Sequence, residues 1–188
     1  MSDEDFRVNA DMKAIYKMED IDLNFRKELS EKVGAKSLLQ CIQCGVCSSG
    51  CTVSEYIDLQ PHRVVASCLL GLKELVLNSN AIWICSLCHQ CTERCPKHVD
   101  YSFLLALLRN MAVENGKIPG DFINVLNNFS EGGLAVPFNE FIQKSTEKRR
   151  ERMDLPKMPQ PNIDQINEII RLCGLDVILD KKTMGEDA

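Results

Sequence analysis

Eight of the ten cysteines in this chain fall into two runs that have the same spacing. The runs are CIQCGVCSSGC, residues 41–51, and CSLCHQCTERC, residues 85–95, and Pro96 follows the second. Both read C-x2-C-x2-C-x3-C. Three cysteines at intervals of three residues lie on one tight loop and point their sulfurs inward, whereas the fourth lies beyond the loop and faces away. Any fold of this chain must therefore close two thiol-lined loops and direct the fourth cysteine of each loop elsewhere.

This spacing is typical of chains that bind two cubane 4Fe–4S clusters, in which each run gives three ligands to its own cluster and one to the other. We therefore predict two clusters. The first is held by Cys41, Cys44, Cys47 and Cys95, and the second by Cys85, Cys88, Cys91 and Cys51. The alternative is a pair of zinc sites, but zinc motifs usually separate two cysteine pairs by a long gap. Four cysteine ligands leave no open coordination position, so we expect these clusters to carry electrons and to bind no substrate.

The composition of the chain argues against nucleic acid binding and against a place in a membrane. The chain has 188 residues and a net charge of −5, so it lacks the basic excess that nucleic acid binding needs. The longest apolar run, FLLALL at 103–108, is too short to cross a membrane, and the polar N-terminus MSDEDFRVNADMK has no signal-peptide character. We therefore expect a cytoplasmic protein with no membrane partner, where thiols stay reduced and favour metal or redox chemistry. Neither a phosphate-binding loop nor a dinucleotide-binding glycine motif is present.

Apolar residues recur at helical spacing between and after the cysteine runs. Pro61 suits a first helical turn, Asp100 can cap a helix, and Gly116 suits the position after its end. The predicted helical segments are residues 22–40, with Gly34 ending the first helix, then 59–80, 99–116, 119–129, 137–154 and 162–174. No convincing alternating strand pattern occurs, so the predicted fold class is all-α, an alpha-helical ferredoxin with two 4Fe–4S clusters.

The predicted organisation has three parts. Residues 1–34 form an N-terminal tail and helix, residues 35–135 form the helical ferredoxin domain, and residues 136–188 form a helical extension that docks on other subunits. The segment LPKMPQP, residues 155–161, cannot continue a helix and is predicted to be an extended linker. The remaining cysteines, Cys68 and Cys173, have no partner at metal-binding spacing and are predicted to be small buried apolar residues.

One resemblance covers roughly residues 35–135. The stretches CIQCGVCSSGCTVSEYIDLQPHRVV and IWICSLCHQCTERCPKHVD resemble HdrC, the C subunit of the cytosolic type of heterodisulfide reductase from methanogenic archaea. Thr52 departs from the pattern, since a proline often follows the fourth cysteine there. We expect this departure to affect only local geometry, with Thr52 capping a helix instead.

The resemblance implies an electron-transfer subunit that is not itself catalytic. Its partners in heterodisulfide reductase would be HdrA, which contains a flavin, and HdrB, which is catalytic and reduces the mixed disulfide of coenzyme M and coenzyme B in methanogenesis. In soluble complexes of this kind the flavin bifurcates electrons, and an associated hydrogenase or formate dehydrogenase supplies them.

Two other functions remain open from the residues alone. The same module could be the iron–sulfur subunit of another oxidoreductase complex, acting on a 2-hydroxyacid, glycerol-3-phosphate or succinate. It could also be a free ferredoxin-like carrier. The linker and the apolar C-terminal helix look suited to docking, which favours a fixed complex over a free carrier.

Overall fold

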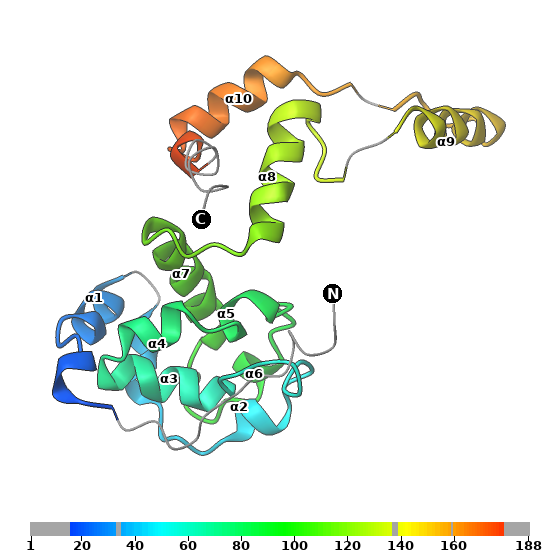
Figure 1. Cartoon of the computed structure of the whole chain (residues 1–188). Coiled ribbons are helices and arrows are strands. Elements are labelled where there is room, and N and C mark those ends of the chain that lie inside the picture. Colours follow the sequence, from blue (N-terminus) through cyan, green and yellow to red (C-terminus); the bar gives the residue numbers. More distant parts are fainter. Residues whose placement is uncertain (1–15, 33–34, 137–138, 159, 179–188) are drawn as a thin grey trace. The chain divides into compact units, whose positions relative to one another are not determined.

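The computed structural model describes residues 16–32, 35–136, 139–158 and 160–178, and every regular element in these ranges is a helix (Figure 1). The elements are η1 (Met18–Asp20), α1 (Phe25–Glu31), η2 (Ala35–Gln40), α2 (Val46–Ser49), α3 (Pro61–Leu70), α4 (Lys73–Leu77), α5 (Ala81–Ile84), α6 (Gln90–Glu93), α7 (Tyr101–Glu114), α8 (Gly120–Gly132), α9 (Glu140–Arg152) and α10 (Ile163–Leu172). The predicted all-α class is confirmed. Gly34, the predicted end of the first helix, lies outside the described residues.

The chain forms two compact units, residues 1–117 and residues 118–188. The first unit contains the elements from η1 to α7 and both cysteine runs. The second contains α8, α9 and α10. No helix in the described ranges is both long and apolar enough to cross a membrane.

The core of the first unit is built around α3 and α7. The apolar residues that these helices bury recur at three- and four-residue intervals, so each helix turns one face inward. They are Val64, Val65 and Cys68 on α3, and Leu104, Leu105, Leu108, Met111 and Ala112 on α7. Helix α7 also packs against η2, α4, α5 and α6. One helix therefore packs against the segment that precedes the second cysteine run and against the one-turn helix inside that run.

The ends of α7 follow the sequence prediction. The Asp100 carboxylate accepts a hydrogen bond of 3.1 Å from the backbone N–H of Phe103 and so caps the first turn. At the other end Gly116 has a φ of 71°, the left-handed conformation that glycine adopts without strain. Both predicted boundary residues are confirmed.

The single helix predicted over residues 59–80 is wrong, because the chain turns at Gly71 between α3 and α4. Gly71 has a φ of 83° and ends α3 as its C-cap. A Cβ there would lie 2.5 Å from the backbone oxygen of Asp22, while the Asp22 N–H donates to the Gly71 carbonyl at 2.8 Å. The apolar pattern continues across this turn, so helical periodicity alone could not detect a break that serves contact with a distant segment.

A small polar network fixes the start of α5, which leads into the second cysteine run. The Asp58 carboxylate accepts hydrogen bonds from the Ser79 hydroxyl at 2.5 Å and from the backbone N–H groups of Asn80 and Ala81 at 3.3 and 3.2 Å. In return, the Asn80 side-chain oxygen accepts from the Asp58 N–H at 2.9 Å. A carboxylate at this place satisfies N–H groups that a short helix leaves without internal partners.

In the second unit α10 packs against α8. Gly133, the C-cap of α8, lies so close to Pro161 and Ile166 that a Cβ would clash with Pro161. Asn162 caps α10, since its side-chain oxygen accepts a hydrogen bond of 3.1 Å from the Gln165 N–H. Cys173 is exposed, so the prediction that it is buried is wrong. It lies just after the last turn of α10 and therefore does not belong to the buried face of that helix.

Candidate functional site

The two cysteine runs fold into the same local structure. In each, a one-turn helix follows the second cysteine, α2 in the first run and α6 in the second. The N-caps, Gly45 and His89, are both left-handed, with φ of 78° and 61°. Two residues earlier, Gln43 and Leu87 also have positive φ, 56° and 53°. The repeated spacing in the sequence is therefore a repeated backbone conformation.

Donors converge on the sulfurs of both runs. The Leu87 N–H lies 3.5 Å from Cys85 Sγ, and the Val99 N–H lies 3.3 Å from Cys95 Sγ. The Gln43 side-chain amide lies 3.2 Å from Cys41 Sγ. Donors aimed at sulfur stabilise the thiolate form, which is the form that binds metals, and they are one of the levers on cluster potential.

A cavity brings together cysteines from both runs. Its lining includes Cys41, Cys44 and Cys47 of the first run together with Cys91 and Cys95 of the second. Its walls are completed by residues of α3 and α7 and by the chain after Cys95, among them His62, Val65, Lys97, Val99 and Tyr101. The fourth cysteine of the second run thus lies beside the first three cysteines of the first run.

The other four cysteines also lie near one another. The charges of Cys51 and Cys85 interact, and each also interacts with Cys88. The Thr52 hydroxyl lies 3.9 Å from Cys88 Sγ, so the residue directly after the first run contacts the second. Residues 52–56 form turns, so the helix that Thr52 was expected to cap is not formed, and the hydroxyl is available to this sulfur.

Burial and hydrogen bonding act on these thiols in opposite directions. Burial raises the pKa of Cys47, Cys51, Cys85 and Cys91. At Cys85 the rise is opposed by the backbone N–H of Leu87 and by the Arg109 guanidinium. Cys88 is exposed, and its pKa is lowered, chiefly by a hydrogen bond from the backbone N–H of Gln90 and then by the Thr52 hydroxyl.

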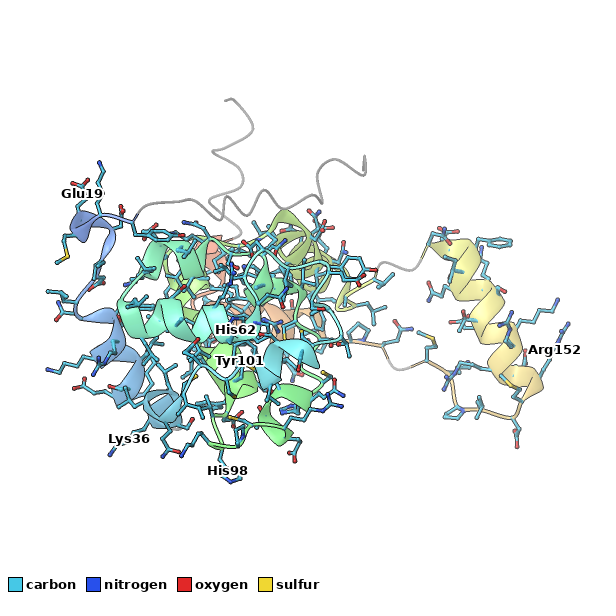
Figure 2. The ribbon with its side chains drawn as sticks, turned by 90° about the horizontal axis from the view of Figure 1, so that it is seen from below. Glu19, Lys36, His62, His98, Tyr101 and Arg152 are labelled. Atoms are coloured by element: carbon cyan, nitrogen blue, oxygen red, sulfur yellow. The ribbon has the colours of Figure 1, made fainter. Side chains whose placement is uncertain are left out.

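Two further side chains complete the walls of the first cavity, and sequence reasoning missed both. His62 lies in the first turn of α3, and its Nδ1 shares a hydrogen bond of 2.6 Å with the Ser48 hydroxyl. Burial is the main cause of the lowered pKa of His62. Tyr101 is buried at the start of α7, and burial raises its pKa well above the usual value. Figure 2 shows the two side chains near one another in the first unit. Only their place in the fold reveals them, since neither belongs to a cysteine run.

The donor set fits an iron–sulfur cluster. Soft thiolates supply every predicted ligand, and N–H donors approach the sulfurs at three of them. Within the described ranges, no three His, Cys, Asp or Glu side chains are grouped to hold a single metal ion. The predicted assignment of individual cysteines to clusters stays a prediction.

Comparison with known proteins agrees with this chemistry. Residues 37–99 match the family described as the 4Fe-4S dicluster domain. The chain is 28% identical to the C subunit of the H(2):CoB-CoM heterodisulfide,ferredoxin reductase of Methanothermobacter thermautotrophicus, over 83% of this chain and 87% of the relative. It is 27% identical to the C subunit of the Ferredoxin:CoB-CoM heterodisulfide reductase of Methanosarcina mazei, over 80% and 94%. The relative in Methanococcus maripaludis, the C2 subunit of an H(2)/formate:CoB-CoM heterodisulfide,ferredoxin reductase, is 29% identical over 79% and 83%.

The chain is similar over most of its length to the C subunits (HdrC) of heterodisulfide reductases. The resemblance seen in the cysteine runs is thereby confirmed, and it extends well beyond them along the chain. The match to the 4Fe-4S dicluster domain supports iron–sulfur clusters as the group that the cysteine runs bind. The all-α structure of its described residues agrees with the predicted helical ferredoxin.

Proposed function

We propose that this chain is the iron–sulfur electron-transfer subunit of a heterodisulfide reductase complex and that it holds two 4Fe–4S clusters. The observation that carries the proposal is the gathering of the eight cysteines of the two runs within one compact unit, in a chain similar to HdrC. When bound, the clusters accept and release single electrons. The chain's own residues hold them, shield them and supply hydrogen bonds to the sulfurs.

The proposed ligation is crossed. Cys41, Cys44, Cys47 and Cys95 hold the first cluster, and Cys85, Cys88, Cys91 and Cys51 hold the second. All four cysteines of the first set line one cavity, which Cys91 also lines, and this supports the first set; the interaction of Cys51 with Cys88 and Cys85 supports the second. Crossing ties both clusters to one core and keeps them close, which electron hopping between them requires.

The proposed partners are HdrA, which carries a flavin, and HdrB, which reduces the CoB–CoM heterodisulfide. Electrons would pass from HdrA through this chain to HdrB. A carrier role between the two partners fits four-cysteine clusters, which leave no position open for a substrate. The names of the relatives include hydrogen, formate and ferredoxin, which supports a hydrogenase or formate dehydrogenase as the upstream source and bifurcation at the flavin of HdrA.

Metal and sulfide analysis of the anaerobically purified chain tests the cofactors. We expect about eight iron and eight sulfide per chain, from two cubanes, with visible absorbance that bleaches on reduction. Stoichiometric zinc without sulfide would end the proposal. Native purification followed by identification of the co-purifying proteins tests the partners, since a monomer without HdrA and HdrB would favour a free carrier.

Single-cysteine variants test the crossing. Cys95→Ser should damage the cluster of Cys41, Cys44 and Cys47, and Cys51→Ser should damage the cluster of the second run. EPR spectra of the reduced variants report each cluster separately. If Cys95→Ser affects only the cluster of its own run, the ligation is not crossed.

A further inference from the structure

Helix α5 ends where the second cysteine run begins, and one side chain of α7 binds this end. A helix as short as Ala81–Ile84 cannot satisfy its last carbonyl groups internally. The half-buried Arg109 donates from Nε to the Ile82 carbonyl at 2.5 Å and from Nη2 to the Cys85 carbonyl at 2.6 Å. A third, longer contact of 3.3 Å joins Nη2 to the Trp83 carbonyl. A single guanidinium thus fixes the backbone immediately before and at the first cysteine of the run.

The same contact holds a permanent positive charge beside the second group of cysteines. A guanidinium does not lose its proton in proteins, and its planar fork keeps it where its hydrogen bonds place it. The charge of a half-buried group is screened by salt less than that of an exposed one. Reduction of a cluster adds one negative charge, so a fixed cation nearby favours the reduced state.

We propose that Arg109 positions Cys85 and raises the reduction potential of the cluster held by Cys51, Cys85, Cys88 and Cys91. The proposal rests on the proposed function, because it requires two clusters in this chain. Arg109 lies on α7, outside both cysteine runs, and is proposed to affect the reduction potential of the second cluster only. The potential of the first cluster then serves as a reference within the same molecule.

Lys97 provides a matched comparison at the other site. Its side chain lines the first cavity but is exposed to solvent. Removing either cation changes the net charge by the same amount. Because an exposed ammonium is well hydrated and screened, we expect its removal to shift the first cluster much less than the removal of Arg109 shifts the second.

The test is a redox titration of the holoprotein followed by EPR, with wild type, Arg109→Gln, Arg109→Lys and Lys97→Gln. At the wild-type midpoint, we expect Arg109→Gln to lower the ratio of reduced to oxidised second cluster by about tenfold, which is about 59 mV for one electron. The first cluster should not shift. Arg109→Lys keeps the charge but not the fork, so its second cluster should titrate near wild type while the protein unfolds at a lower temperature.

Each result separates the proposal from its alternatives. An unchanged second potential in Arg109→Gln, or an equal shift of both clusters, overturns it. A shift in Arg109→Lys as large as in Arg109→Gln shows that hydrogen-bond geometry acts and not charge, and also overturns it. If Arg109→Gln loses the second cluster, Arg109→Lys decides: a retained cluster with wild-type potential supports the proposal, and a lost one overturns it. Wild-type protein without two EPR-distinct cubanes would instead refute the proposed function.

Discussion

His89 and Gly45 occupy the same place in two copies of one loop, yet only one of them is a glycine. Both are left-handed N-caps of one-turn helices, and His89 is exposed. At Gly45 an added Cβ would meet no protein atom within 4 Å. The left-handed backbone conformation, and not crowding by other protein atoms, therefore explains why a glycine suits this position. His89 must therefore hold a strained backbone at a position where the chain could have used glycine.

We expect His89→Gly to stabilise the holoprotein by up to about 1 kcal/mol. Relief of left-handed strain is worth about 1–2 kcal/mol, while the added freedom of the unfolded glycine costs about 0.5–1 kcal/mol. The reverse change, Gly45→Ala, should destabilise by about 1 kcal/mol, because it adds strain at the same position of the other loop. Thermal unfolding under anaerobic conditions measures both. A less stable His89→Gly would mean that the imidazole makes a stabilising contact.

The two cysteines outside the runs should differ in reactivity. Burial raises the pKa of Cys68 to about 12, and its side chain is fully covered, whereas Cys173 is exposed. Thiolates and not thiols are alkylated, so a short treatment of the holoprotein with iodoacetamide should label Cys173 and spare Cys68. Mass spectrometry of peptides identifies the site, and Cys173→Ser should abolish the labelling. Modification of Cys68 in the folded protein would contradict its place in the core.

At the scale of the helices, the turn between α3 and α4 leaves no room for a Cβ atom at Gly71. We expect Gly71→Ala to destabilise the protein by about 2 kcal/mol or more, since it combines left-handed strain with a clash against the Asp22 backbone. Gly116→Ala is the matched control, with a φ of 71° but no protein atom within 4 Å of the added Cβ. It should cost only the strain, about 1 kcal/mol. Equal losses of stability would show that the contact with Asp22 is unimportant.

At the scale of the whole molecule, some apolar residues of α10 pack within its own unit and others are exposed to solvent. Ile170 is buried, and Ile166 lies against Gly133 of the second unit. Ile169 and Leu172 are 59% and 72% exposed. We propose that this exposed pair belongs to the docking extension and contacts HdrB, since a helix presenting two faces can serve its own unit and a partner at once.

Ile169→Asp combined with Leu172→Asp should leave iron content unchanged and weaken assembly with HdrB by at least about tenfold, because charge would have to be buried at the interface. Gln165→Asp with Asn167→Asp makes the same charge change at exposed polar positions of α10 and should bind normally. Pull-down and iron analysis on the same samples give both readouts. Full partner binding by the apolar-to-acidic variant would exclude this face from the interface.

Local sequence determined the helices, their caps and the repeated loop, since these depend on residues within about four positions of each other. The spacing of the cysteines, the cap at Asp100 and the glycine at 116 could therefore be read from the sequence and were found in the structure. Tertiary structure alone decided what meets across the fold. The turn at Gly71 depends on contact with Asp22, and the contact of Arg109 with α5 joins residues more than twenty positions apart. Such contacts follow from how helix faces pack, and a chain's local pattern is compatible with several packings until the whole core selects one.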